Sequence, residues 1–225
     1  MTKIVQDTQA ECSLVTTLKS WLINYERLED IHVSDVMYPR LAILKRRHGI
    51  LLSDREVFFY TCGRAHHDVV EALVNKNEVK HDVELEYEGI VGSIDVLSST
   101  DEPVEIKTTR VWYPYTEDNI PPGYTRQLGC YVAIANPGKT SGTGKLMIFY
   151  ICPKDKKNKK EHPFIAVYNV EYDNLDIIRK EMVDTKGRIL ASMDNGNVLD
   201  FEECEGCKEY KKDNCAYKKW CYGES

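Results

Sequence analysis

The spacing of hydrophobic positions predicts three helices in the first third of the chain. Residues 8–30 carry apolar side chains at helical spacing, namely Trp21, Leu22, Tyr25 and Leu28. A second helix is expected from a cap at Ser34 or Asp35 to about His48, with Pro39 near its first turn. A third helix is expected over residues 54–74.

The hydrophobic period then changes from helical spacing to alternation. Three strands are predicted, over residues 80–88, 89–98 and 103–109. They are followed by a proline- and aromatic-rich loop at 111–123, a helix at 124–135, strands at 145–152 and 163–171, and a helix at 173–193. This order predicts an α/β fold in which a mixed central sheet is flanked by helices.

Composition narrows the class of protein without identifying a function. The chain has 225 residues, of which 42% are hydrophobic and 29% charged, as in ordinary globular proteins. No apolar run approaches a membrane span, and the polar N-terminus does not resemble a secretory signal, so we expect a cytoplasmic protein with no membrane contact. The formal net charge of -6 argues against nucleic-acid binding by bulk charge alone.

Charge is unevenly distributed along the chain. Residues 68–105 hold eleven acids and two lysines. Basic side chains gather in a turn at 154–160 and on a predicted helix face formed by Arg40, Lys45, Arg46 and Arg47. Solvated surface is the ordinary explanation of such runs. An acidic centre with basic edges also suits metal-dependent chemistry on a polyanion.

Asp95 and Glu105 are the strongest candidates for chemistry. A symmetric hairpin centred near Thr100 would place them opposite each other on one face, with Cβ atoms roughly 4.5–5.5 Å apart. Two carboxylates so placed suit a hard divalent ion such as Mg²⁺ or Mn²⁺. Alternation puts Lys107 on the same face, where it could orient or deprotonate a water, and turns Ile106 toward the core. An ordinary cross-strand salt bridge is the alternative explanation.

Neighbouring residues favour the metal site over the salt bridge. Gly63, His67 and Glu71 follow one face of the third helix, so His67 could supply a nitrogen ligand, although a structural histidine is the alternative. Gly92, three residues before Asp95, permits close backbone approach. On the helix after the hairpin, one face carries two residues that could reach one phosphate or base, Gln127 and Tyr131.

Eight cysteines form two groups. Cys12, Cys62, Cys130 and Cys152 are scattered and are expected to be small buried side chains. The other four lie in the last 22 residues and are expected to bind a metal rather than form disulfides, at Cys204, Cys207, Cys215 and Cys221.

The ordered set Gly63-x3-His67-x3-Glu71, Gly92-x2-Asp95, Glu105-x-Lys107 and Gln127-x3-Tyr131 resembles the RecB-type nucleases of the PD-(D/E)XK superfamily. With the C-terminal cysteines, it most resembles the CRISPR-associated RecB-like exonucleases, which carry an iron–sulfur cluster; AddB-type repair nucleases share that arrangement. The resemblance covers roughly residues 34–221.

The resemblance implies a restriction-endonuclease-like core and a role for each residue. Asp95, Glu105 and the Ile106 carbonyl would hold the metal, with His67 as a further ligand, and Lys107 would assist the water. Gln127 and Tyr131 would help to position DNA. Aromatic side chains of the following loop could stack on unpaired bases or pack on the core instead, at Trp112, Tyr113, Tyr115 and Tyr124.

The cysteine pattern departs from the family at one position. Tyr38 stands where the family has its first cluster cysteine, so we expect Cys221 to replace that ligand, with Cys12 as the alternative. Four thiolates suit a 4Fe–4S cluster or Zn²⁺, and the spacing favours 4Fe–4S because it lacks a second Cys-x2-Cys. A cluster bound only by C-terminal ligands would fold its own small lobe and would no longer tie the two ends of the chain together.

The expected function is metal-dependent exonucleolytic hydrolysis of single-stranded or frayed DNA ends, in CRISPR spacer acquisition or DNA repair. Two alternatives are a non-catalytic DNA-end-binding or adaptor subunit and a structure-specific repair endonuclease. CRISPR adaptation or repair proteins are candidate partners, and an oligomer is compatible with the sequence. The expected divisions are an N-terminal helical segment at 1–33, the nuclease core at 34–198 and a cysteine-rich segment packed on the core at 199–225.

Overall fold

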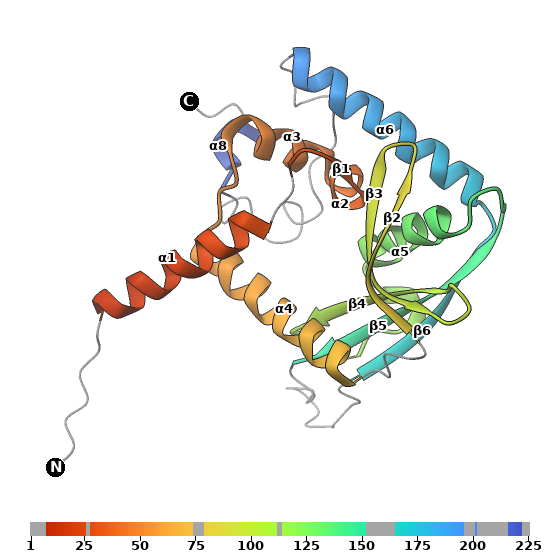
Figure 1. Ribbon diagram of the computed structural model, residues 1–225, viewed down its shortest axis with the longest axis horizontal. Coiled ribbons are helices and arrows are strands. Elements are labelled where there is room, and N and C mark those ends of the chain that lie inside the picture. The colour runs from red at the N-terminus through yellow and green to blue at the C-terminus, as the bar shows by residue number, and fades with distance from the viewer. Residues whose placement is uncertain are drawn as a thin grey trace.

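A mixed six-stranded sheet is the central feature of the fold (Figure 1). It is seen in a computed structural model, which describes residues 8–25, 28–73, 79–111, 114–151, 165–195, 201 and 216–221. The strands are β1 (Ile31–His32), β2 (Val79–Tyr87), β3 (Ile90–Ser98), β4 (Pro103–Thr109), β5 (Gly142–Tyr150) and β6 (Ile165–Tyr172). Their order is β1-β3-β4-β5-β6, with β2 also paired to β3. The β1–β3 and β4–β5 pairs are parallel and the others antiparallel, which confirms the predicted mixed sheet.

The helices flank this sheet, as the hydrophobic spacing predicted. They are α1 (Thr8–Tyr25), α2 (Val33–Met37), α3 (Pro39–His48), α4 (Asp54–Leu73), α5 (Pro122–Ala135), α6 (Leu175–Asn195) and α8 (Lys218–Cys221), with a 3₁₀ turn at Glu117–Asn119. The single helix expected over 34–48 is two helices. Tyr38 leaves the helical region, with φ −128° and ψ 61°, because the residue before a proline is disfavoured there.

Strand β1 was not predicted and lies inside the expected N-terminal segment 1–33. Its two residues pair with Ile90 and Val91 of β3, so the sheet begins before residue 34. Two residues are too short to show a hydrophobic period. Parallel pairing with a strand almost 60 residues later is a tertiary contact.

Helix α5 connects the parallel strands β4 and β5 and packs on the sheet. Leu128 and Val132 of α5 form one buried cluster with Leu146 and Ile148 of β5. The end of α5 is held by a buried arginine of α6: Arg179 donates hydrogen bonds to the carbonyls of Ala133, Asn136 and Lys139. A cation at a helix C-terminus satisfies otherwise open carbonyls and complements the helix dipole.

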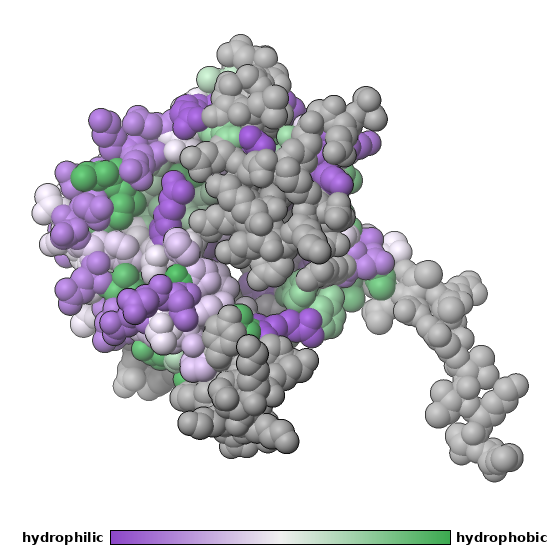
Figure 2. Space-filling model, turned by 180° about the vertical axis from the view of Figure 1, so that it is seen from behind, coloured by the Kyte–Doolittle hydropathy of each residue, from purple (hydrophilic) through white to green (hydrophobic). Residues whose placement is uncertain are grey.

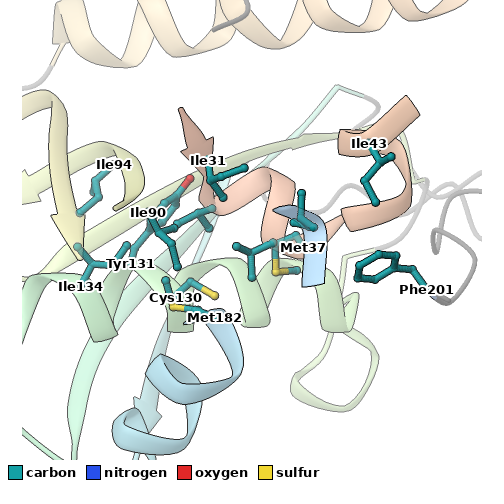
Figure 3. Close-up of a cluster of buried hydrophobic side chains, with 13 residues drawn as sticks. Ile31, Met37, Ile43, Ile90, Ile94, Cys130, Tyr131, Ile134, Met182 and Phe201 are labelled. Atoms are coloured by element: carbon teal, nitrogen blue, oxygen red, sulfur yellow. The ribbon is translucent and has the colours of Figure 1, made fainter. Parts of the chain in front are cut away.

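A second core cluster lies between α2, α3, α5, α6 and β3 (Figure 3). It includes Ile31, Ile90, Ile94 and Ile134. Cys130 lies within it at 3% exposure, and burial raises the pKa of its thiol to about 12. The prediction that Cys130 is a packing residue is therefore confirmed.

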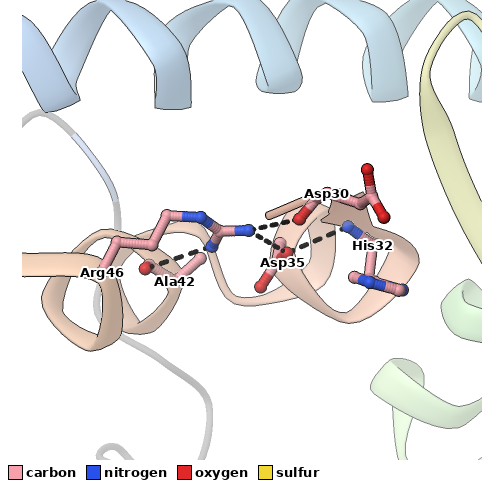
Figure 4. Close-up of polar contacts among 5 residues, drawn as sticks. All are labelled: Asp30, His32, Asp35, Ala42 and Arg46. Carbon is pink, nitrogen blue, oxygen red and sulfur yellow. Dashed lines mark hydrogen bonds and ion pairs between the residues drawn. The ribbon is translucent and has the colours of Figure 1, made fainter. Parts of the chain in front are cut away.

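The basic face predicted on residues 40–47 is largely internal. Arg46 donates hydrogen bonds to the carbonyls of Ala42 and Asp30 and to Asp35 Oδ2, at 3.3, 2.6 and 2.8 Å (Figure 4). The same carboxylate oxygen accepts the N–H of His32 at 2.9 Å. These bonds tie α2 to α3. The spacing of arginines along the helix could not show whether they bind other parts of the chain or lie on a basic surface, because both roles use the same residue type.

The described end of the C-terminal segment packs on α3. Tyr217 is 2% exposed, and its hydroxyl bonds to Gly49 O and Leu51 N, each at 2.7 Å. Cys221 is buried in the same cluster, and its Sγ accepts a hydrogen bond from Arg40 Nη1 at 3.4 Å. Residues 216–221 therefore pack on the N-terminal third of the chain, and Arg40 is buried rather than part of a basic surface.

On the one face that Figure 2 shows, the described residues visible away from α1 are mainly hydrophilic. Figure 2 shows isolated hydrophobic side chains scattered among polar ones on that side. Such single apolar residues are normal on a protein surface. In the part of the chain that the structure describes, no helix combines the length and the apolar character needed to cross a bilayer.

Candidate active site

The β3–β4 hairpin has the predicted register, and it opens where the candidate acids lie. Val96 pairs with Val104 and Leu97 with Pro103, as expected for a hairpin centred on residue 100. The ladder ends there, one position before Asp95 and Glu105. Beyond the end of the ladder, the backbone N–H of Ile106 donates a hydrogen bond to the side-chain oxygen Asp95 Oδ2 at 2.7 Å instead of to a backbone carbonyl of β3. The side chain of Asp95 thus replaces a ladder bond and is held against β4.

Glu105 and Lys107 lie on the face of β4 that looks toward α5. The Lys107 ammonium pairs with Glu105 Oε1, and the Glu105 side chain is 3% exposed. Burying a carboxylate so deeply is costly unless a cation or hydrogen-bond donors compensate its charge. Ile106 lies on the opposite face in a cluster with Val96 and Val104, so the predicted alternation is confirmed.

Gln127 and Tyr131 of α5 form hydrogen bonds that continue from the Lys107 ammonium. Lys107 Nζ donates to Gln127 Oε1 at 2.9 Å, and Gln127 Nε2 donates to the Tyr131 hydroxyl at 2.9 Å. Tyr131 is 5% exposed, so it contacts the interior and holds Gln127 in place. Gly92 allows this approach: a Cβ there would lie 3.0 Å from Ile134 Cδ1 and 3.2 Å from Tyr131 Cδ1. The expected close approach at Gly92 is confirmed.

The charges of Glu105 and Asp95 both influence the pKa of Lys107. Burial by itself would lower the pKa of Lys107, but the charge and hydrogen bond of Glu105, followed by the charge of Asp95, outweigh it and raise that pKa. Burial, reinforced by Glu105 and Asp95, also raises the pKa of Tyr131 well above its usual value. At neutral pH, Lys107 is therefore an ammonium and Tyr131 a neutral phenol.

These residues suit a hard divalent cation. Asp95 and Glu105 offer carboxylate oxygens, the donors that Mg²⁺ and Mn²⁺ prefer, and the raised pKa of Lys107 shows that their negative potential stabilises a positive charge. Within the described ranges, no three His, Cys, Asp or Glu side chains gather in a metal-binding group. The predicted further ligand, His67, has its backbone in α4, but its side chain lies outside the described residues, as does that of Glu71.

A pocket of about 370 Å³ reaches this site from the side of α1 and α4. Its lining includes Asp95 and Ser93 of β3 and Gly63 of α4. Since Gly63 was predicted to share a helix face with His67, the shared pocket supports the expectation that this face of α4 looks toward Asp95. A Cβ at Gly63 would meet no atom within 4 Å, so the glycine leaves open space there.

The loop after β4 is partly outside the described residues, and Trp112 and Tyr113 fall in that part. Tyr115 packs on the sheet: its N–H donates to the Tyr150 hydroxyl at 2.8 Å, and its carbonyl accepts from the Tyr168 hydroxyl at 2.7 Å. The core-packing alternative therefore holds for Tyr115. Tyr124 lies closer to the site, with its ring centroid 5.7 Å from Lys107 Nζ.

Sequence reasoning missed the aromatic side chains of the α1–α4 pocket. Phe59 and Tyr60 of α4 and Trp21 of α1 line it. The sequence did indicate an exposed aromatic side chain on this helix. Three aromatic residues are consecutive there, Phe58, Phe59 and Tyr60, and they cannot all face one core.

The cysteine segment falls mostly outside the described residues. Cys204, Cys207 and Cys215 lie there, as do Cys152 and the side chain of Cys12. Cys221 is described as a buried free thiol. The proposed ligand set therefore stays a prediction.

Comparisons with known proteins identify the family. The chain is similar to the crystal structure of SSO0001, with 17% identity, a TM-score of 0.57 and coverage of 98% of both chains. It is also similar to an alkaline exonuclease (LHK-Exo) from Laribacter hongkongensis, with 16% identity, a TM-score of 0.44 and coverage of 75% of this chain and 92% of that one. No curated protein matches the sequence. Residues 35–222 match the family model of the PD-(D/E)XK nuclease superfamily, and the chain belongs to that superfamily.

Proposed function

We propose that the protein is a metal-dependent DNA nuclease that acts as an exonuclease on single-stranded or frayed ends. The observation that carries the proposal is the meeting of Asp95, Glu105 and Lys107 where β3 and β4 part. A binding module has no reason to gather buried carboxylates beside a phosphate backbone, because they repel it. A site that binds a divalent cation does need them.

Each side chain has a distinct task in this proposal. Asp95, Glu105 and the Ile106 carbonyl would hold the ion, with His67 as a further ligand. When bound, Mg²⁺ or Mn²⁺ would polarise the scissile phosphate and make a water more acidic. Asp95 is held in place by the Ile106 N–H, so its carboxylate is oriented before the ion binds.

Lys107 and Gln127 would then meet the phosphate. Lys107, paired with Glu105, would orient or deprotonate the attacking water and stabilise the negative charge that develops on the phosphate. Gln127 fixes the ammonium through its Oε1 atom. Tyr131, being buried, is a positioning residue for Gln127, and Gln127 would make the DNA contact.

We further propose a 4Fe–4S cluster bound by Cys204, Cys207, Cys215 and Cys221, with Zn²⁺ as the alternative metal. In support, Cys221 lies beside Arg40, two residues after Tyr38, the position where the family carries its first cluster cysteine. A ligand at Cys221 would therefore reach the same region of the fold from the other end of the chain. A role in CRISPR adaptation or in DNA repair is proposed on the resemblance alone.

The decisive experiment is a nuclease assay on end-labelled single- and double-stranded DNA with Mg²⁺ or Mn²⁺. Glu105→Gln should abolish hydrolysis. Glu102→Gln is the matched control, since Glu102 sits on the same hairpin and pairs with Lys145 at 2.9 Å, away from the site. Retained hydrolysis by Glu105→Gln would refute the assignment.

A circular single-stranded substrate separates the rival functions. An exonuclease cannot begin on it, whereas a structure-specific endonuclease of the same superfamily could cut it. A protein that binds DNA ends but hydrolyses none of these substrates with either metal would instead be an adaptor subunit.

A further inference from the structure

The pocket between α1, α4 and the β2–β3 hairpin is lined by both aromatic and polar side chains. Trp21 of α1 and Phe59 and Tyr60 of α4 contribute the aromatic side chains, called its aromatic walls below, and Ser93 and Asp95 of β3 contribute polar groups. The volume of about 370 Å³ lies at the lower end of the range for small-ligand sites. One end of the pocket therefore belongs to the proposed catalytic centre, because Asp95 is part of both.

The aromatic walls are open to solvent. Trp21 is 47% exposed, Phe59 38% and Tyr60 46%. Exposed aromatic side chains gathered around one concavity are unusual on a surface that has no ligand to cover them. Flat aromatic rings beside a site that cuts a polynucleotide match the way proteins hold unpaired bases, since every base offers a face for stacking.

A positive charge lies beside Phe59, one of the aromatic residues of the pocket. Arg110 follows β4, three residues after Lys107, and is exposed. Its guanidinium carbon is 5.2 Å from the Phe58 ring centroid and 5.4 Å from that of Phe59. Cation–π contacts orient the guanidinium plane while leaving its N–H groups able to bind a phosphate.

We propose that the α1–α4 pocket binds an unpaired nucleobase of the strand being cut, stacked on Phe59 and Tyr60, while Arg110 binds a neighbouring phosphate. The inference rests on DNA as the substrate of the proposed nuclease, and it makes base stacking the reason for a single-strand preference. A base inside a duplex cannot stack on these rings, because its faces are already covered by the neighbouring base pairs.

The test measures binding without hydrolysis, in EDTA, with the full-length protein. Fluorescence anisotropy compares a labelled oligothymidylate with an oligomer of the same length built from abasic residues. The wild type should bind the base-containing strand roughly tenfold more tightly. Phe59→Leu and Tyr60→Leu should each remove most of that preference. Val69→Ala is the matched control: this residue is 57% exposed on the same helix but does not line the pocket. Thermal melts establish that all variants are folded.

Arg110 has its own measurement. Arg110→Ala should weaken binding of both oligomers alike and lower the salt dependence of the association constant by about one phosphate contact. A loss confined to the base-containing strand would overturn the assignment of Arg110 to a phosphate.

The outcomes separate the pocket from the catalytic proposal. Hydrolysis with no preference for bases over abasic residues, or equal losses in Val69→Ala and Phe59→Leu, would overturn the pocket and leave the nuclease. A base preference that depends on Phe59 and Tyr60, in a protein that never hydrolyses DNA, would support the pocket and overturn the nuclease. A change of oligomeric state in Phe59→Leu would assign the walls to a second copy of the chain and overturn the proposal.

Discussion

Asp95 accepts a hydrogen bond from the backbone N–H of Ile106 at the point where the β3–β4 ladder ends. This bond holds the carboxylate of one strand against the backbone of the next, beside Glu105. The oxygen of Asp95 accepts the Ile106 N–H, whereas its negative charge would hold a cation. A substitution can remove the charge and keep the hydrogen bond.

Asp95→Asn should keep the fold and lose hydrolysis. The amide oxygen can still accept the Ile106 N–H, but the negative charge that would hold a cation is gone. We expect the rate of DNA hydrolysis to fall by about two orders of magnitude or more, while the melting temperature in EDTA changes little. Asp95→Ala should lose both the hydrogen bond to the Ile106 N–H and the negative charge. An active Asp95→Ala protein would refute the role of this residue.

Tyr131→Phe should affect turnover more than substrate binding. The substitution removes the hydroxyl that accepts from Gln127 Nε2 but leaves the ring in its buried place. Loss of that hydrogen bond should cost about 1 kcal/mol in the free energy of unfolding. Single-turnover rates should fall while oligonucleotide affinity in EDTA stays constant. Equal loss in the single-turnover rate and in the affinity would show that the Tyr131 hydroxyl supports DNA binding rather than the chemical step.

Two glycines should respond to alanine in opposite directions. At Gly92 the added Cβ meets Ile134 and Tyr131 at about 3 Å, so Gly92→Ala should lower the free energy of unfolding by roughly 1–3 kcal/mol. At Gly63 the Cβ meets nothing within 4 Å inside helix α4, so Gly63→Ala should raise it by roughly 0.5–1 kcal/mol. Urea denaturation measures both, and the same sign for the two variants would contradict the packing described.

The stability conferred by Glu102 should depend on pH at the acidic end. Its hydrogen bond to Lys145, opposed by burial and aided by Thr143, lowers the pKa of this carboxylate from 4.5. A lowered folded pKa stabilises the protein above pH 4.5, and that contribution is lost as the pH falls through the lowered value. Glu102→Gln should therefore cost up to about 1 kcal/mol at pH 7. Denaturation curves of both proteins should converge in acid, and a difference that persists below the folded pKa would show that charge is not its cause.

Cys221→Ser should remove the bound metal if the proposed ligand set is right. The expected result is loss of iron and sulfide, or of zinc, measured by elemental analysis of the purified protein. Cys62→Ser, on the partly exposed face of α4, is the control and should change nothing. Full metal retention in Cys221→Ser would leave its thiol as a packing group beside Arg40, and Cys12→Ser would then test the alternative ligand.

The amino-acid sequence by itself determined most of the local elements and the chemistry of the hairpin. Alternation fixes which side of a strand a residue occupies, so it alone places Glu105 and Lys107 on one face and Ile106 on the other. The symmetric position of the acids about residue 100 likewise predicted the register, since a tight turn sets the pairing of its strands.

Only the tertiary structure decided which distant residues meet. β1 joins β3, Cys221 reaches Arg40 across 181 positions, and Tyr131 lies against Gly92, because burial of apolar surface selects these contacts over many others of equal local propensity. The aromatic pocket has the same origin. Trp21 and Phe59 are ordinary helix residues in the sequence, and the packing of α1 on α4 is what brings them to the edge of the site.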